Sequence, residues 1–264
     1  MTFPRFPVSF DDGHVALGVR ADAGTDLGRA LRAMGLTTGV PTIVAVGAGS
    51  RPAQLSRLGP LLEKVVVAVA EAVDATVVDE GDAGGLAEAL GRARRHKKAG
   101  FPFVGVASHG ARPGDIDPDA LDSAHTHLVF VPSGPGAGLA GWIASVATAV
   151  AGGNRSVALA VAGRDPAWDS VAAQVRAGRL VMAVARSGGV ADHLAAAVAG
   201  RPADRRAQAL VASGQIFAVD PSRGAAYVAD TLRSALSRPD ALGPAREAGR
   251  DGRPAREAEG PPRR

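Results

Sequence analysis

Residues 77–94, VVDEGDAGGLAEALGRAR, combine an apolar strand, a glycine-rich turn and a helix with a basic end. A glycine-rich turn between a strand and a helix often binds an anion, because backbone N–H groups and the helix dipole both favour negative charge. This turn instead carries Asp79, Glu80 and Asp82. The stretch therefore predicts one strand–turn–helix unit of an α/β fold, with three carboxylates at a position where an anion would be expected.

The same alternation of strand and helix continues on both sides of this unit. Strands are expected at 42–46, 75–79, 101–107, 127–132, 156–162 and 180–185. Helices are expected at 53–73 with an interruption near Pro60, and at 84–98, 138–152, 167–177, 190–199 and 223–237. Several strands are continuous apolar runs, as is typical of strands covered on both faces. The pattern predicts an α/β fold: a Rossmann-like, doubly wound, mainly parallel sheet with helices on both faces.

Three regions are expected along the chain. Residues 1–40 form an N-terminal extension, a hairpin turning at Asp12-Gly13 followed by a short helix near 25–34. Residues 41–238 form the Rossmann-like domain. Residues 239–264 are rich in Pro, Gly, Arg and Glu with little to bury, so this tail is expected to be disordered.

Composition excludes several classes of protein. The 264 residues include no cysteine, which excludes disulfides and thiolate metal sites. No leader-like segment and no run of about 18 apolar residues is present, so a cytoplasmic protein without a membrane partner is expected. The net charge is only +4, and the basic run at 92–98 ends a predicted helix, where cations complement the dipole. Nucleic acid is therefore not an expected partner, and the arginine-rich composition is typical of GC-rich, bacterial coding sequences.

Glycine-rich loops follow most of the predicted strands. In doubly wound sheets, ligands bind outside the carboxyl ends of the strands. The loops expected there are GAGSRP (47–52), EGDAGG (80–85), SHGARPGDID (108–117), SGPGAG (133–138), GRDPAW (163–168) and RSGG (186–189). Several such loops at one edge favour a ligand site, whereas the alternative is that the glycines only permit tight turns.

NAD is the first ligand to consider. Gly47 and Gly49 match two glycines of the dinucleotide fingerprint, but Pro52 stands where the third is needed. Asp79 ends the second strand thirty positions after Gly49, compared with about 20 in the fingerprint. An NAD-binding Rossmann protein therefore remains only a second alternative.

The order of three motifs is more informative. The chain resembles the SLOG superfamily, and more closely the prokaryotic relatives of the ligand-sensing N-terminal domain of melastatin-type TRP channels. The matching positions are Asp79, Gly81, Gly84 or Gly85, Gly91 and Ala93, then Leu121, His125, Thr126 and His127, and finally Ser187, Gly188, Ala191 and Asp192. The resemblance covers about residues 41–200.

This resemblance implies a sensor or ligand-binding protein for a nucleotide or nucleotide-derived small molecule of the ADP-ribose type. More distantly, the chain is similar to lonely-guy phosphoribohydrolases, which cleave N-glycosidic bonds with a P-G-G-x-G-T-x-x-E loop. The corresponding segment keeps Gly163 but has no matching glutamate, so catalysis is not expected. A hydrolase of an N-glycosidic or phosphoester bond, using Asp165 or Asp169, is the alternative. No cofactor is expected, and pairing of two copies through helices is expected by analogy alone.

The resemblance also suggests the site. Asp79 is expected to accept hydrogen bonds from a ribose. Phosphate is expected at Gly47–Ser50 or at Ser187–Gly189, with Arg51, Arg164 or Arg186 as cations. The complete set of expected ligand-binding residues is Gly47, Gly49, Ser50, Asp79, Gly81, Gly84, Gly85, Gly163, Arg164, Ser187, Gly188 and Gly189. Glu80 and Asp82 would repel a phosphate, so they point away from it, or the loop faces the sugar, or the site is vestigial.

Two histidines allow a metal-site interpretation, which we do not favour. His125 and His127 would share a face of an extended segment, with His109, Asp115 and Asp117 in a nearby loop. A zinc site needs a third well-placed ligand, however, and packing of the histidines at the strand entrance is the simpler expectation. No metal is therefore expected. Trp168 is expected in the core or stacked on a base.

Overall fold

The protein is built on one nine-stranded sheet, in the order β1-β2-β6-β5-β4-β3-β7-β8-β9. The computed structural model describes residues 4–109, 116–133 and 138–237. The strands are β1 (Arg5–Ser9), β2 (Val15–Arg20), β3 (Thr42–Val46), β4 (Thr76–Glu80), β5 (Phe103–His109), β6 (His127–Pro132), β7 (Ser156–Ala160), β8 (Leu180–Val184) and β9 (Ile216–Val219). All neighbouring strands are parallel except the β1–β2 hairpin. The predicted Rossmann-like, doubly wound α/β sheet is confirmed.

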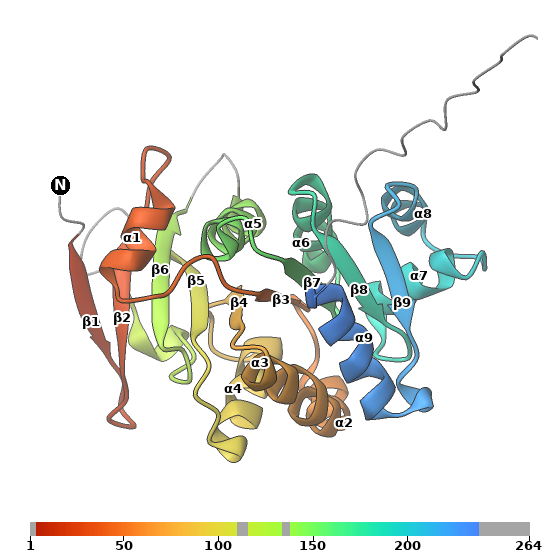
Figure 1. Ribbon diagram of the computed structural model, residues 1–264, viewed down its shortest axis with the longest axis horizontal. Coiled ribbons are helices and arrows are strands. Elements are labelled where there is room, and N and C mark those ends of the chain that lie inside the picture. Colours follow the sequence, from red (N-terminus) through yellow and green to blue (C-terminus); the bar gives the residue numbers. More distant parts are fainter. Residues whose placement is uncertain (1–3, 110–115, 134–137, 238–264) are drawn as a thin grey trace, which may run out of the picture.

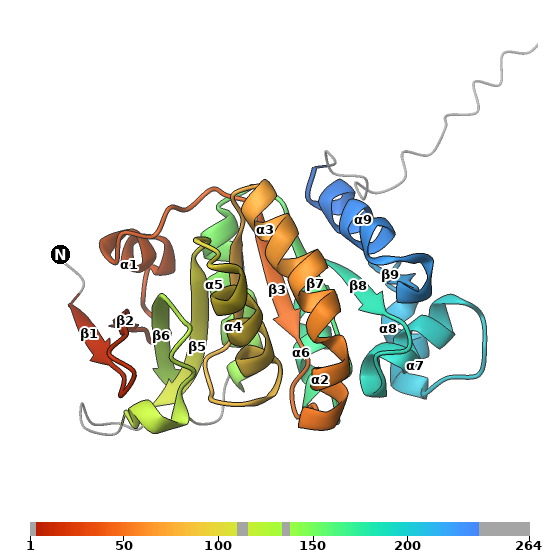
Figure 2. The same ribbon diagram turned by 90° about the horizontal axis from the view of Figure 1, so that it is seen from below.

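Helices cover both faces of the sheet (Figure 1). One layer contains α1 (Leu27–Ala33), α5 (Gly138–Ala151), α6 (Pro166–Arg176), α7 (Gly189–Val198) and α8 (Arg205–Val211). The other contains α2 (Pro52–Leu61), the π-helix η1 (Leu62–Val67), α3 (Ala68–Ala72), α4 (Gly85–Lys97) and α9 (Ala225–Ser237). Figure 2 looks onto this second layer. Alternate strand side chains therefore enter two separate cores, which explains the continuous apolar runs in the sequence.

The order of the strands reverses between β3 and β7. After β3 the chain adds β4, β5 and β6 on one side, and α5 then carries it back to β7, β8 and β9 on the other side. Strands β3 and β7 pair along their whole length, from Thr42 with Ser156 to Val46 with Ala160. Their carboxyl ends form the topological switch point, where ligands bind in folds of this kind.

The N-terminal hairpin belongs to the same sheet. Strand β2 pairs in parallel with β6, from Leu17 with His127 to Arg20 with Phe130. Helix α1 follows, capped by the Asp26 carboxylate, which accepts the Arg29 N–H at 3.0 Å. The hairpin and helix expected within residues 1–40 are both present, and they extend the edge of the main sheet. The tail expected at 239–264 lies outside the described residues.

Most predicted elements agree with the structure within two residues, but two were missed. Helix α8 and strand β9 were not predicted, because a seven-residue helix with three polar side chains and a four-residue strand give little periodic signal. The helix predicted at 53–73 is continuous through Pro60 and changes to π-helical geometry at Leu62–Val67. Pro60 has no N–H to donate to the preceding turn, so the winding can adjust beyond it. No helix among the described residues has the length and apolar character to span a bilayer.

Candidate functional site

Three loops interlock at the carboxyl ends of β3, β7 and β8. The Ser50 hydroxyl donates to the Gly47 carbonyl at 2.6 Å and accepts the Gly163 N–H at 3.0 Å. Ser187 has the corresponding role at the next strand, where its hydroxyl accepts the Ala162 N–H at 2.8 Å. Both serines are buried. Their hydroxyls therefore connect neighbouring loops and are not free for a ligand.

Helix α7 begins directly on the loop that follows β7. Val190 N–H donates to the Gly163 carbonyl and Ala191 N–H to the Ala162 carbonyl, each at 3.0 Å. A Cβ atom on Gly189 would lie 1.9 Å from the Gly163 carbonyl oxygen, so only glycine fits there. Two N–H groups in the first turn of α7 are consequently occupied. An anion beside Gly189 would depend on side-chain cations as much as on this helix.

Arginines surround these loops. Arg51, Arg164 and Arg186 are exposed, and Arg186 pairs with Asp220 at 3.2 Å. Within the described segments of the chain, Arg51 and Arg164 form no ion pair. Arg164 is therefore available to an anionic ligand, and so is Arg51.

A cavity of about 250 Å³ opens between the starts of α6, α7 and α8. Its lining comprises Gly163, Arg164, Asp165, Trp168, Gly189, Val190, His193, Asp204 and Arg206. The Arg206 guanidinium lies 4.5 Å from the centre of the Trp168 ring, and it pairs with Asp204 at 3.0 Å. The volume is below that of most whole-ligand pockets, so it fits one end of a nucleotide-sized molecule.

The predicted site residues thus fall into two groups. The structure brings together Gly47, Gly49, Ser50, Gly163, Arg164, Ser187, Gly188 and Gly189 at the carboxyl ends of β3, β7 and β8. Gly81 and Gly84 lie in the turn between β4 and α4, and Gly85 is the first residue of α4. The start of α4 approaches the first group where Leu86 packs over Gly47. None of these assignments to a ligand is tested by the geometry alone, and they remain predictions.

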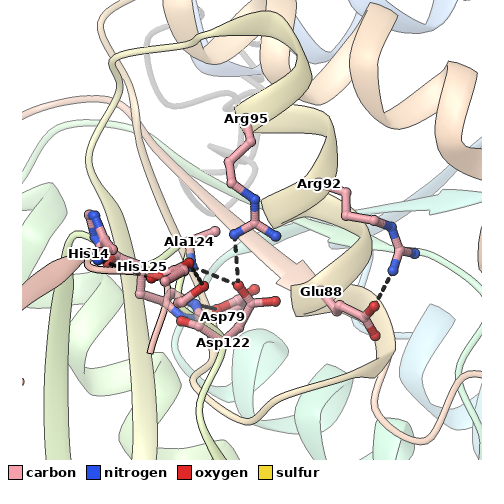
Figure 3. Close-up of polar contacts among 10 residues, drawn as sticks. His14, Asp79, Glu88, Arg92, Arg95, Asp122, Ala124 and His125 are labelled. Carbon is pink, nitrogen blue, oxygen red and sulfur yellow. Dashed lines mark hydrogen bonds and ion pairs between the residues drawn. The ribbon is translucent and has the colours of Figure 1, made fainter. Parts of the chain in front are cut away.

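Asp79 differs from the others because it is enclosed. It is 2% exposed, and its Oδ1 atom lies 2.8 Å from Nε2 of His125, which is fully buried (Figure 3). Nδ1 of His125 lies 2.9 Å from the Asp122 carbonyl, to which it can only donate. Ribose hydroxyls cannot reach this carboxylate without opening the core. The expected contact between Asp79 and a ribose does not fit the structure.

Close glycine contacts make room for this buried pair. A Cβ on Gly105 would lie 3.0 Å from the His125 ring, and a Cβ on Gly91 would lie 2.6 Å from Ala124 Cβ. The turn after β4 is also fixed by backbone bonds, since Asp122 N–H donates to Gly81 O and Ala83 N–H to Ala120 O. The acidic turn therefore packs against the segment that precedes β6, and several glycines of the motif serve this packing.

The side chain of Asp122 interacts with a backbone N–H group and with Arg95. Asp122 Oδ1 accepts the Ala124 N–H at 2.8 Å and lies 3.7 Å from the guanidinium of Arg95, near the end of α4 (Figure 3). Burial raises the pKa of Asp79 to about 6, although the charge and hydrogen bond of His125 oppose this shift. Burial lowers the pKa of His125, but the charge and hydrogen bond of Asp79 outweigh it and the net direction is upward. Because Nδ1 donates to the Asp122 carbonyl, the contact between Nε2 and Asp79 Oδ1 is a hydrogen bond that contains one proton.

Glu80 points to the opposite side of β4 from Asp79, because neighbouring strand residues alternate. It is half-buried, and burial followed by repulsion from Asp79 and Asp82 raises its pKa to about 7. Asp82 also has a raised pKa, mainly through burial. From the sequence alone, Glu80 is expected only to repel a phosphate. Its position at the end of a central strand could have identified it as a candidate acid–base group.

His125 and His127 lie in the hydrophobic cores on opposite faces of the sheet. His125 packs on Phe103, with ring centres 4.2 Å apart, beneath α4. His127 hydrogen bonds with the backbone of Met34, in the core on the other face. The two side chains do not share a face, because the segment is not extended at His125, which lies in a turn before β6 begins. No cluster of three metal-ligating side chains occurs among the described residues.

Asp165 and Asp169, the two aspartates of the hydrolase alternative, are both exposed, and of the two Asp165 lines the small cavity. Asp165 is 86% exposed at its side chain and lies 3.4 Å from Arg206. Asp169 is exposed on α6. The segment 110–115, which contains Asp115, lies outside the described residues.

Comparison with known proteins agrees with the motif order. No curated protein matches the chain significantly. Among solved structures, the X-ray structure of TM1055, a structural genomics target, is similar with 15% identity and a TM-score of 0.43, over 69% of this chain and 91% of that one. The family model described as "SLOG in TRPM, prokaryote" matches residues 40–230. This match spans the sheet from β3 to β9 and the beginning of α9, and the chain therefore belongs to the prokaryotic family of SLOG domains related to TRPM channels.

Proposed function

We propose that this protein binds a nucleotide or nucleotide-derived small molecule of the ADP-ribose type, and that it acts as a sensor or ligand-binding protein. The observation that carries the proposal is the convergence of three loops at the switch point, 47–51, 162–165 and 186–189. Membership of a family named for a TRPM domain supports the same class of ligand.

The phosphate end of the ligand is assigned to the small cavity beside Arg164. This arginine lines the cavity and has no carboxylate partner among the described residues. Gly163 and Gly189 also line the cavity, where the absence of side chains lets the two loops pack directly against each other. Arg51, exposed on the loop after β3, is proposed as the cation for a second phosphate. The remainder of the ligand would lie across the loops towards β3.

Calorimetric titration with adenosine, AMP, ADP-ribose and NAD tests this proposal. Arg164→Gln should weaken AMP and ADP-ribose at least about tenfold, the effect of losing one hydrogen bond to a charged group. Adenosine should be unaffected. Arg201→Gln is the matched control, because it removes one exposed charge that does not line the cavity. Equal losses in the two variants would reject the site, and binding of NAD alone would favour the dinucleotide alternative.

Hydrolysis of such a ligand is a second candidate, favoured by Glu80. A half-buried carboxyl with its pKa raised to about 7 suits general acid–base chemistry near neutral pH. It lies one strand from the switch point, since β4 pairs with β3. Incubation of the protein with AMP and ADP-ribose should release free base or ribose phosphate if this is correct. Glu80→Gln should then abolish turnover, whereas Asp169→Asn should leave it unchanged.

A further inference from the structure

A large cavity lies at the amino ends of the strands, on the opposite side of the sheet from the loops of the proposed site. It has a volume of about 1340 Å³ and includes the first residues of β7, β8 and β9, Ser156, Leu180 and Ile216. The end of α5 forms one side and α9 forms the other. A cavity of this size is large enough for a whole nucleotide-sized molecule.

A buried cation lines this cavity. Arg179 is 3% exposed, and its Nε donates to Ser156 Oγ at 2.8 Å. Its other nitrogens donate to the Gln174 amide oxygen, to Thr148 Oγ1 at 3.0 Å and to the Ala144 carbonyl at 3.5 Å. All of these acceptors are neutral. Burial lowers the pKa of Arg179 to about 10, so the side chain remains charged at neutral pH.

No carboxylate in the described segments of the chain pairs with this guanidinium. The ends of α5 and α6 nearby supply only partial negative charge. The one acidic lining residue, Asp230, is already paired with Arg233. A buried charge without a full counter-charge is costly, and an anion in the cavity would relieve that cost.

Two further features indicate which anion would fit. Arg155, half-exposed in the lining, forms no ion pair with any described residue. Phe217 and Tyr227 present partly buried rings on the α9 side, and the Arg223 guanidinium lies 3.7 Å from the Tyr227 ring centre. Gly153 is also in the lining and leaves open space where a Cβ would stand. The lining therefore combines cationic side chains with aromatic surface.

We propose that this cavity is a second binding site, for a phosphorylated small molecule that carries an aromatic ring, such as a nucleoside monophosphate. Arg155 contacts the phosphate, the buried charge of Arg179 stabilises the phosphate from beneath the lining without direct contact, and the rings of Phe217 and Tyr227 contact the base. This site is independent of the proposed function, because it shares no residue with the loops at the carboxyl edge.

Titration of the full chain with AMP, adenosine and inorganic phosphate tests the second site. AMP should bind at a site that Arg155→Gln weakens at least about tenfold while Arg164→Gln and Arg201→Gln leave it unchanged. Inorganic phosphate should show the same dependence on Arg155 with lower affinity. If the function proposed above is wrong, Arg164→Gln will leave all AMP binding unchanged, whereas Arg155→Gln will still weaken it.

Arg179→Lys provides a second test, because it keeps the charge and loses the planar fork. This variant should retain the fold and weaken AMP more than adenosine. Identical AMP affinities in wild type, Arg155→Gln and Arg179→Lys would overturn the proposal, and Arg179 would then serve only to bind the ends of α5 and α6. The proposal would also be overturned if AMP raised the melting temperature of the protein no more than sodium chloride does at equal ionic strength.

Discussion

His125 Nε2 lies 2.8 Å from Asp79 Oδ1, and these two residues, 46 positions apart, form a buried polar pair beneath α4. The second carboxylate oxygen of Asp79 has no hydrogen-bond partner among the described residues. The pair connects the turn after β4 with the segment that enters β6. Removing one partner from such a pair leaves the other buried without compensation.

His125→Ala should therefore destabilise the fold by about 3–5 kcal/mol at pH 7. The loss should be smaller at pH 5, where the unpaired Asp79 takes up a proton and buries no charge. Asp79→Asn is the control, because its amide can donate to His125 Nε2 while His125 still donates to the Asp122 carbonyl. Urea unfolding at both pH values measures the difference. Equal and small losses in both variants would show that the pair carries little stability.

Glu80 should make the protein less stable as the pH rises. Its pKa is raised from 4.5 to about 7, so between these values the folded state binds more protons than the unfolded state. The free energy of unfolding therefore falls with rising pH in this window, and the contribution is lost above the folded-state value.

Glu80→Gln should flatten that slope and raise stability by about 1–2 kcal/mol at pH 8, less than the full shift implies because the side chain is partly exposed. At pH 4 the two proteins should be nearly equal. Glu88→Gln on the exposed face of α4 is a control with the same loss of charge. Parallel pH profiles for wild type and Glu80→Gln would contradict the assignment.

Gly91 should resist substitution although it lies inside a helix. Alanine normally stabilises a helix interior relative to glycine by about 1 kcal/mol. At Gly91 the added Cβ would lie 2.6 Å from Ala124 and 2.8 Å from Asp122 Oδ1, so α4 must move away from the turn. Gly91→Ala should therefore destabilise, whereas Gly28→Ala in α1, where the new Cβ would meet only the flexible end of Arg32 at 3.3 Å and Asp26 Oδ1 at 3.5 Å, should stabilise slightly. Thermal unfolding of the two variants should give shifts of opposite sign.

Gly189 provides a stricter case at the candidate site. Gly189 and Gly200 both have positive φ, +56° and +67°, so alanine costs about 1–2 kcal/mol in backbone strain at either position. Only at Gly189 would the new Cβ also collide with a backbone oxygen, at 1.9 Å from Gly163. Gly189→Ala should lose clearly more stability than Gly200→Ala and should weaken AMP binding. Similar unfolding free energies for the two variants would show that the loops can separate freely.

The architecture could be predicted from local sequence. The apolar runs at 42–46 and 127–132 coincide with β3 and β6, because a strand buried on both faces needs an uninterrupted apolar segment. The order of the motifs also predicted the family, since it depends on residue types and spacing alone. Helix α8 and strand β9 were missed because their stability comes from packing on neighbours, which leaves no periodic signal in so few residues.

Side-chain roles depended on the tertiary structure. The sequence places Asp79 at the end of a strand, where a ribose acceptor is reasonable, but only the folded chain brings His125 against it. Arg179 follows a helix like many other arginines, and only the packing of α5 and α6 buries it without a carboxylate among the described residues. Secondary structure follows from the pattern of neighbouring residues, whereas the protonation and accessibility of a group depend on distant residues that burial brings around it.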